Sequence, residues 1–381
     1  MEWKEVRLGD ILNFRRGHDL PHSAMKPGNI PVAGSNGIIG YHDTATPIKP
    51  ILTIGRSGNV GKPYFYEEAW AHNTTLYVDD FKGNDPKFLY YLCQTMPFAN
   101  FGGGSAVPTL NRNHIHPLET KIPVKVEDQR RIASILSSLD RKIELNNKIN
   151  DDLEEMAQAI FKNWFVDFEP FKDGKFVDSE LGMIPEGWKV GRLDEIADVV
   201  GGSTPSKAKP EYYTQKGIAW LTPKDLSNHP AVYTSRGEID ITEEGYNSTS
   251  TKLMPKGTVL FTSRAPIGYI SIALNDICTN QGFKSLVPKK AGTCSLYCFL
   301  KYVTPEIENK STGSTFKEAS GSLMKSLQVI IPEQKDFEEF EAIVSPLFAR
   351  IESLEKENSR LSLLRDTLLP RLMSGELEVP E

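Results

Sequence analysis

A helical stripe that occurs twice constrains the fold of this 381-residue chain more than any other feature. The first copy lies in residues 127–165. It consists of apolar residues and two Asn residues: Ile132, Leu136, Leu139, Ile143, Asn146, Asn150, Leu153, Met156 and Ile160. Successive members are three or four residues apart, which predicts a long amphipathic helix that pairs along a narrow seam, as in a coiled coil.

The second copy of the stripe begins 208 residues later and has the same spacing. Its members are Phe340, Val344, Leu347, Ile351, Leu354, Asn358, Leu361, Leu364 and Leu368. The polar position Asn150 recurs as Asn358, and a buried Asn commonly fixes the register of paired helices. Because one chain carries both stripes, we expect the two helices, residues 127–165 and 336–369, to pair within the molecule.

The segments that precede the two helices are also related. Trp3, Lys4, Arg7, Leu8 and Ile11 recur as Trp188, Lys189, Arg192, Leu193 and Ile196. Residues 51–61 match residues 259–268 if one residue is skipped, which aligns Arg56 with Arg264, and Asn73 then aligns with Asn280. Residues 102–123 similarly match 311–332. The chain is therefore an internal duplication, which predicts a pseudo-two-fold repeat.

The duplication predicts the domain organisation of a chain that is too long for one hydrophobic core. We expect a globular domain in residues 1–125, a helix and linker in 126–185, a second globular domain in 186–331 and a C-terminal helix in 332–381. Short β-type runs, as in residues 51–54, 76–78, 259–262 and 269–273, alternate with Gly, Pro and Asn breaks, and helices are expected at 86–94 and 295–303. The predicted class is α+β, with two mixed α/β domains joined by two long helices.

The charge of the chain is distributed unevenly. The globular segments carry net charges of +2 and +3, whereas the helical segments carry −5 and −6. This distribution suits two domains that face nucleic acid on an acidic scaffold. Because the sequence has neither a run of eighteen apolar residues nor a signal-like N-terminus, we expect a cytoplasmic protein without a membrane segment. Four cysteines are predicted to be buried free thiols: Cys93, Cys278, Cys294 and Cys298.

No motif supports catalysis in this chain. The stretch GRSGNVGK at 55–62 has five residues between its glycines and no Ser or Thr after Lys62, so it departs from a phosphate-binding P-loop. Glu308 and Lys310 have a nuclease-like spacing but no partner Asp. We therefore expect no enzyme activity, metal or cofactor here. The aromatic run 160–171 leaves two alternatives open, a partner-docking patch or packing of the helix end on a domain.

Polar residues in the expected loops suit DNA recognition. Arg and Lys neutralise phosphates or read guanine, and Asn and Gln can read adenine with two hydrogen bonds. The candidates in the first domain are Arg15, Arg16, Arg56, Asn59, Lys62, Asn73, Ser105, Asn111 and Arg112. The candidates in the second domain are Lys207, Lys209, Arg264, Asn280, Gln281, Thr315 and Lys317.

Four phrases, placed in order around the duplicated framework, carry a family resemblance: QRRIASILSSLD, AIFKNWFVDFEPF, LGMIPEGW and LLPRLMSGELEV. Over essentially its whole length, the chain resembles the specificity subunit of Type I restriction-modification enzymes. The resemblance implies two target recognition domains on two antiparallel spacer helices, each domain reading one half of a bipartite, asymmetric DNA target. It also implies a chain without chemistry of its own. Such a chain recruits two modification subunits, which methylate adenine with S-adenosylmethionine, and restriction subunits, which use ATP and Mg²⁺.

The length of the helical stripe agrees with that function. Ile132 to Ile160 spans 28 residues, or about 42 Å of helix, which is the length of about 12 base pairs. We therefore expect two short half-sites separated by an unread spacer of roughly 5 to 8 base pairs. The alternative is a coiled-coil interaction scaffold whose two heads bind proteins and never DNA, a role that the acidic helices would suit equally well.

Overall fold

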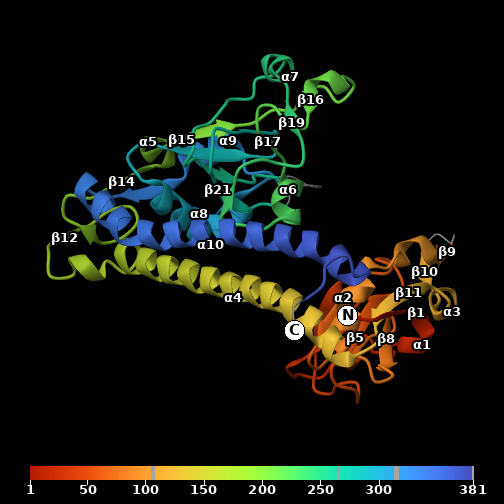
Figure 1. The fold of residues 1–381 in the computed structure, drawn as a ribbon. Helices are drawn as coiled ribbons and strands as arrows, with labels where there is room; N and C mark the ends of the chain where they lie inside the picture. Colours follow the sequence, from red (N-terminus) through yellow and green to blue (C-terminus); the bar gives the residue numbers. More distant parts are fainter. Residues whose placement is uncertain (104–107, 265, 313–316, 380–381) are drawn as a thin grey trace. The chain divides into compact units, whose positions relative to one another are not determined.

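The computed structural model describes residues 1–103, 108–264, 266–312 and 317–379. The chain forms two compact units (Figure 1). Unit 1 consists of Met1–Glu144 with Asn358–Glu381, and unit 2 consists of Leu145–Glu357. Each unit therefore contains one globular head and one part of each long helix. We call the part before helix α4 (Val126–Phe165) head 1, and the part between α4 and helix α10 (Gln334–Ser374) head 2.

The core of head 1 is a four-stranded antiparallel sheet with the order β2-β8-β5-β6. Its strands are β2 (Asn13–Arg16), β5 (Ile51–Gly55), β6 (Pro63–Tyr66) and β8 (Thr75–Asp80). All five residues of β5 are buried, as expected of a central strand. Helix α2 (Pro86–Thr95) begins where Asp85 accepts a hydrogen bond from the Phe88 N–H at 2.8 Å. These elements confirm the expected strands and helix.

Smaller elements complete head 1. Strand β1 (Trp3–Arg7) pairs with β11 (Glu119–Pro123), β4 (Gly37–His42) and β7 (Trp70–Ala71) flank β3 (Ile30–Gly34), and β9 (Gly102–Gly103) pairs with β10 (Thr109–Leu110). The helical turns are α1 (Leu8–Ile11), η1 (His22–Ala24), η2 (Phe98–Phe101) and α3 (Arg112–Ile115).

Head 2 repeats this core with five strands in the order β15-β23-β20-β21-β18. They are β15 (Ala197–Gly201), β18 (Tyr233–Thr234), β20 (Val259–Phe261), β21 (Ile270–Ala273) and β23 (Lys284–Pro288). The elements that echo head 1 are β14 (Lys189–Arg192) paired with β24 (Gln328–Ile331), α5 (Leu193–Ile196) and α8 (Thr293–Lys310). Helix α9 (Gly321–Ser326) precedes β24.

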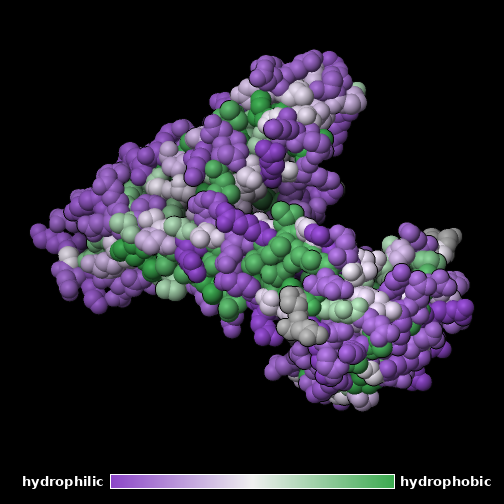
Figure 2. All heavy atoms as spheres, viewed as in Figure 1, coloured by the Kyte–Doolittle hydropathy of each residue, from purple (hydrophilic) through white to green (hydrophobic). Residues whose placement is uncertain are grey.

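The two heads differ most between their first and second core strands. Head 2 carries η4 (Pro210–Tyr212), β16 (Tyr213–Thr214), β17 (Trp220–Leu221), α6 (Pro223–Asn228), β19 (Asp240–Ile241) and α7 (Glu243–Asn247) in this region, and β22 (Cys278–Thr279) pairs with β17. On the face drawn in Figure 2, hydrophilic residues predominate over the part that holds β16, β19 and α7. The segment before head 2 contains η3 (Glu169–Phe171), β12 (Phe176–Val177) and β13 (Ile184–Pro185).

Backbone contacts test the internal repeat directly. The Leu8 N–H bonds to the Leu118 carbonyl at 2.8 Å, and the Leu193 N–H bonds to the Leu327 carbonyl at 2.9 Å. A Cβ atom on Gly17 would lie 2.1 Å from the carbonyl oxygen of His72, and one on Gly202 would lie 2.1 Å from that of Thr279. Both positions therefore need glycine for the same close approach. This match also confirms the alignment of the next residues, Asn73 and Asn280.

The predicted alignment of Arg56 with Arg264 is wrong. The loop after the second core strand closes in the same way in both heads, through the bonds Gly61 N to Gly55 O at 2.7 Å and Gly268 N to Thr262 O at 3.0 Å. No residue is skipped, so Arg56 corresponds to Ser263, and Arg264 corresponds to Ser57. The sequence alignment skipped a residue in order to align two Arg side chains. The backbone hydrogen bonds show instead that the two loops have the same length.

The two long helices are α4 (Val126–Phe165) and α10 (Gln334–Ser374), and α10 continues five residues past its expected end at residue 369. They are antiparallel within each unit. In unit 1, Asp140 pairs with Arg365 at 2.9 Å, and in unit 2 the Asn146 side chain donates to Glu357 at 2.9 Å. In Figure 1, the second half of α4 runs beside the first half of α10. The expected helical pair is therefore present.

The stripe does not form one continuous helix–helix seam. Ile132 and Leu136 belong to the core of head 1, and Phe340, Val344 and Ile351 belong to the core of head 2. The first turns of each helix therefore pack on the head that precedes it. Asn146, Asn150 and Leu354 are also buried. Eight further members are half-buried: Leu139, Ile143, Leu153, Ile160, Leu347, Asn358, Leu361 and Leu368.

Two predicted members of the stripe are exposed. Met156 retains 51% and its repeat equivalent Leu364 retains 46% of the accessible surface. The core of head 2 instead buries Ala157 and Phe161. Asn150, Leu153 and Met156 follow one another at intervals of three residues, each less than a full helical turn. Two such intervals in succession rotate Met156 away from the contact face. The prediction that Met156 and Leu364 face the partner helix is wrong.

The aromatic run after position 160 packs on head 2. Phe161 lies 6.0 Å, and Phe165 4.9 Å, from the Phe340 ring centre, and Phe171 lies 4.7 Å from the Trp188 ring centre. Of the two alternatives for this run, packing is therefore confirmed. The four cysteines are free and buried, as expected. Within the described part of the chain, no helix is both long and apolar enough to cross a membrane.

Candidate nucleic-acid interface

Several loops of head 1 meet at one edge of its central sheet. The strand register pairs Arg16 at the end of β2 with Leu76 at the start of β8, and Gly55 at the end of β5 with Thr75. Strand β6 starts opposite Ile54. The loops 16–19, 55–62 and 72–74 therefore share this edge, and the Leu110 N–H joins them by bonding to the Arg56 carbonyl at 2.8 Å. We call these residues the loop edge of head 1.

Head 2 has an equivalent loop edge. Gly201 at the end of β15 pairs with Lys284 at the start of β23, and Phe261 at the end of β20 pairs with Ile270. This register gathers loops 201–204, 262–264, 266–269 and 279–283. The Ala319 N–H bonds to the Ser263 carbonyl at 2.8 Å, as Leu110 does to Arg56 in head 1. The duplicated framework therefore presents the same edge twice.

Cations with little neutralising charge occupy the loop edge of head 1. The Arg16 side chain is 57% exposed and lies 3.6 Å from Asp19. Arg56 is half-buried, and burial together with the positive charge of Arg16 lowers the pKa of Arg56. Two guanidinium groups that repel each other favour an anion near both of them. Asn59 and Lys62 are exposed on the same loop, and the Lys62 ammonium lies 5.4 Å from the Tyr64 ring centre.

Four other candidates of head 1 already serve internal contacts. Arg15 pairs with Asp79 at 2.7 Å. Arg112 donates to the Phe14 carbonyl at 3.1 Å, Asn111 caps α3 by accepting the Asn113 N–H at 3.0 Å, and Asn73 donates to Asp19. The Arg15 side chain is nevertheless 61% exposed, and Asn111 and Arg112 are also exposed. Their contact with DNA stays a prediction.

One carboxylate holds two cations at the loop edge of head 2. Glu318 lies 3.0 Å from the Arg264 guanidinium and 3.7 Å from the Lys284 ammonium. The Lys284 side chain is only 16% exposed, and burial lowers its pKa, while Glu318 opposes that shift. Lys284 and Glu318 were not among the residues predicted from the sequence. No local signal marks them, because the sheet register and the bridge between Arg264 and Glu318 bring them together.

The remaining candidates of head 2 differ in how free their side chains are. Gln281 accepts a hydrogen bond from Thr204, and Asn280 accepts one from the Gly282 N–H at 2.8 Å. Lys209 donates to the Tyr212 hydroxyl at 2.8 Å, and this bond raises the pKa of Lys209. Lys317 donates to the Glu308 carbonyl at 3.3 Å, while Lys207 is exposed. The candidates Ser105 and Thr315 lie outside the described residues.

Comparison with known proteins identifies the family of the two domains that carry these loop edges. Residues 1–155 and 185–363 match the model of the Type I restriction modification DNA specificity domain. The chain belongs to this family. Each match contains one head with its loop edge, so the molecule carries two specificity domains, and the predicted family is confirmed.

Individual relatives agree with this assignment. The Type I restriction enzyme MjaIX specificity subunit of Methanocaldococcus jannaschii is 40% identical over 191 residues, which cover 49% of this chain and 44% of that protein. The HindI specificity subunit of Haemophilus influenzae is 27% identical over 98% of this chain and 94% of that protein. The crystal structure of an S subunit from M. genitalium has the same fold, with a TM-score of 0.63 at 17% identity over 98% of this chain and 96% of that one.

Among the described residues, the loop 55–62 is not a P-loop and no metal-binding cluster is found. The loop 55–62 joins the antiparallel strands β5 and β6, whereas a P-loop leads from a strand into a helix. Within the ranges that the structure describes, no group of three or more His, Cys, Asp and Glu residues could hold a metal ion.

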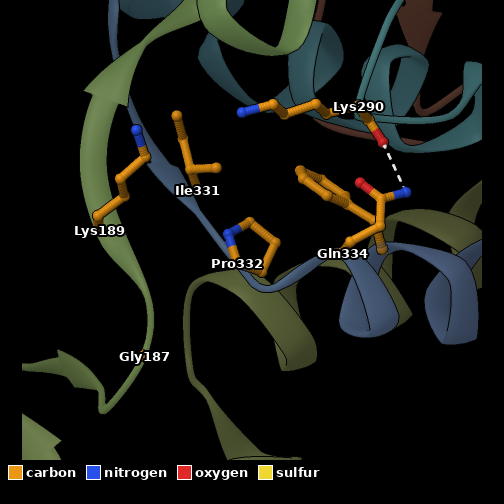
Figure 3. A pocket seen from close by; sticks show the side chains of 7 residues that line it. Gly187, Lys189, Lys290, Ile331, Pro332 and Gln334 are labelled. Carbon is orange, nitrogen blue, oxygen red and sulfur yellow. Dashed lines mark hydrogen bonds between the residues drawn. The ribbon is translucent and has the colours of Figure 1, made fainter.

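A pocket of about 220 Å³ lies away from the loop edge of head 2, at the start of α10 (Figure 3). Its lining includes Lys189, Lys290 and Gln334, and the Gln334 side chain donates to the Lys290 carbonyl at 3.5 Å. Lys189 already pairs with Glu195 at 2.7 Å. The pocket is smaller than ordinary small-molecule sites. The loop edges are therefore the better candidate sites.

Proposed function

We propose that this chain is the non-catalytic DNA-recognition subunit of a Type I restriction-modification complex, in which each specificity domain reads one half of a bipartite, asymmetric target. The observation that carries the proposal is the repeated loop edge with different cations. Arg16 and Arg56 occupy it in head 1, and Arg264 and Lys284 occupy it in head 2. A shared framework with different loop residues suits two different half-sites.

The same proposal assigns the chemistry to partner subunits. Two modification subunits would methylate adenine with S-adenosylmethionine, and restriction subunits would use ATP and Mg²⁺. Methylation of a base inside a duplex requires the base to be flipped out, so the DNA must be held while the partner acts. The repeated helices support two partners, because the internal repeat offers each partner an equivalent surface. The expected compartment is the cytoplasm.

Methylation-sensitive sequencing of cells that express the chain with its modification subunits tests the proposed target. We expect two short half-sites separated by an unread spacer of roughly 5 to 8 base pairs. A single contiguous palindrome would contradict the proposal. Removal of one heptad from both helices, about 10 Å of length, should shorten the tolerated spacer and leave both half-sites unchanged.

Salt dependence of DNA binding separates this function from a protein scaffold. Phosphate contacts release counterions, so the complex should bind duplex DNA less tightly as salt rises. Arg56→Gln should reduce the slope of log K against log salt by about one. Its matched control is Ser263→Ala at the equivalent position of head 2, which should leave the slope unchanged. A wild-type complex without any salt-dependent DNA binding would instead support a scaffold of protein-binding heads.

A further inference from the structure

Head 1 contains a β-hairpin, β3–β4, that head 2 lacks. Strands β3 and β4 are joined by the two-residue turn Ser35–Asn36. In head 2, β17 occupies the place of β3, because β17 pairs in parallel with β22 as β3 does with β7. Strand β17 is followed by helix α6 rather than by a second strand. Whatever the hairpin does is therefore specific to the first specificity domain.

A bulge turns two apolar side chains of this hairpin outward. The register of β3 with β4 shifts between Val32 and Ala33, so that Ile39 has no partner in the ladder. As a result, Ile38 and Tyr41 lie on the same side of β4, although they are three positions apart and would face opposite sides of a regular strand. Ile38 is 50% and Tyr41 is 56% exposed. Two neighbouring apolar groups exposed on a short ribbon indicate a surface that becomes covered on binding.

The tip of the hairpin lies beside the basic loop of head 1. A Cβ atom on Gly55 would lie 3.2 Å from the Ser35 carbonyl oxygen, and one on Gly58 would lie 3.9 Å from the Ser35 hydroxyl. The loop 55–62 that contacts the tip carries Arg56 and Lys62. Asn36, at the tip itself, is exposed. The hairpin therefore projects from the same loop edge that presents the cations.

The charge beside the hairpin tip is complementary to DNA. Residues 20–42 contain no Asp or Glu, and Lys26 lies 3.9 Å from Asp43, which follows β4. The pair Arg16 and Arg56 on the neighbouring loops favours a phosphate there. A two-stranded ribbon also has the width that the major groove of B-DNA admits.

We propose that the β3–β4 hairpin is a specificity-determining element of head 1, which enters a groove of the DNA and directs Asn36 and Ile38 to base edges. Asn can bond an adenine edge with two hydrogen bonds, and an apolar side chain can contact the thymine methyl group. Arg16 and Arg56 hold the adjacent phosphates. The inference rests on the proposed function and adds a reading element to it.

The test uses the full chain in complex with its modification subunits, after the target of the wild type has been sequenced. Ile38→Ser and Asn36→Ala should each weaken binding to the target duplex by about 5- to 100-fold, since one good base contact contributes that much discrimination. The loss should disappear when the first half-site is scrambled, and discrimination within the second half-site should stay unchanged. Val124→Ser, at another exposed apolar residue of unit 1, is the matched control.

Three outcomes would overturn the inference. Wild-type affinity and an unchanged methylated sequence for both hairpin variants would show that the ribbon reads no base. Loss of complex assembly in Ile38→Ser, with DNA binding of the assembled fraction intact, would make the hairpin a protein-docking surface. In both cases the salt-sensitive binding of the wild type keeps the proposed function standing. If the wild-type complex does not discriminate between DNA sequences, the proposed function fails and the inference fails with it.

Discussion

Asp140 and Phe348 occupy the same position of the repeat, 208 residues apart, and they stabilise their units by different interactions. In unit 1, Asp140 of α4 accepts a hydrogen bond from Tyr91 at 2.5 Å and pairs with Arg365 of α10 at 2.9 Å. In unit 2, the equivalents of Asp140 and Arg365 are Phe348 and Ala157, which are 1% and 0% exposed. A polar network in unit 1 and apolar core packing in unit 2 therefore support the same backbone arrangement.

The two units thus share one backbone geometry but use different side-chain chemistry to hold it. An ion pair in a protected site and a well-packed apolar contact are nearly equal in free energy, because desolvation offsets the attraction of the charges. The exchange is tolerated only when all partners change together. The same holds at the loop edges, where the backbone closes identically around Arg56 and Ser263 while the charged groups differ.

We expect the greatest loss of stability when Phe348 of unit 2 is replaced by Asp, the residue at the equivalent position 140 of unit 1. Phe348→Asp would bury a carboxylate beside Ala157 with no cation opposite it, and we expect it to lower the free energy of unfolding of unit 2 by more than about 4 kcal/mol. Urea unfolding with hydrogen exchange of each unit measures this. Phe348→Leu is the control and should lower the free energy of unfolding of unit 2 by much less. Native protection of unit 2 in Phe348→Asp would contradict the comparison.

Loss of the ion pair between Asp140 and Arg365 should lower the stability of unit 1 by a smaller amount. Arg365→Met removes the cation and leaves Asp140 with the Tyr91 hydroxyl, which should cost unit 1 about 2 kcal/mol because both charged side chains are about one-quarter exposed. The single variants Asp140→Ala and Arg365→Ala together with their double variant form a cycle, and a coupling of about 1 kcal/mol is expected from chemical denaturation. Additive single effects would show that the pair contributes nothing as a pair.

The smallest expected difference between the two units is in the pH dependence of their stability. Glu355 of α10 accepts the N–H groups of Val232 and Tyr233 at 2.7 and 3.0 Å in head 2, and its repeat equivalent is Asn147. Burial raises the pKa of Glu355 from 4.5 to about 7, although these two bonds oppose the shift. The neighbouring charges of Glu154 and Glu352 act in the same direction as burial.

The sign of the pH effect follows from proton binding. Between pH 4.5 and about 7 the folded state holds a proton that the unfolded state has lost, so unit 2 should become less stable as pH rises through this window. Glu355→Gln should remove this slope and stabilise unit 2 at pH 8 by about 1 kcal/mol. Melting temperatures from pH 5 to 8 measure it. A variant that keeps the wild-type slope would assign the titration to another group, and unit 1 is the internal control.

The sequence alone determined the duplication, the two long helices and the family. These features follow from periodicity, because a stripe with steps of three and four residues has one helical solution, and its repetition in one chain implies two similar heads. The strands around Ile51 and Val259 could be predicted for a similar reason, since buried β-branched runs between Gly and Pro breaks have few alternatives.

The candidate site was predictable only in part. Arg16, Arg56 and Lys62 are charged residues in loops, and composition was enough to select them. No local signal marks Lys284, and Glu318 lies 54 residues from Arg264. The Ser35–Asn36 turn of the hairpin is followed by Gly37, and this Asn-Gly pair between apolar residues is a recognisable turn signal that was not among the predicted sites.

The tertiary structure alone decided which members of the stripe face a head, the other helix or solvent. Met156 and Leu364 fit the stripe as well as Ile132 does, yet they are exposed and Ile132 is buried in head 1. Periodicity determines the side of a helix on which a residue lies. It does not determine whether that side contacts a head, the other helix or solvent. That depends on contacts between residues far apart in the chain, and only the packed structure contains them.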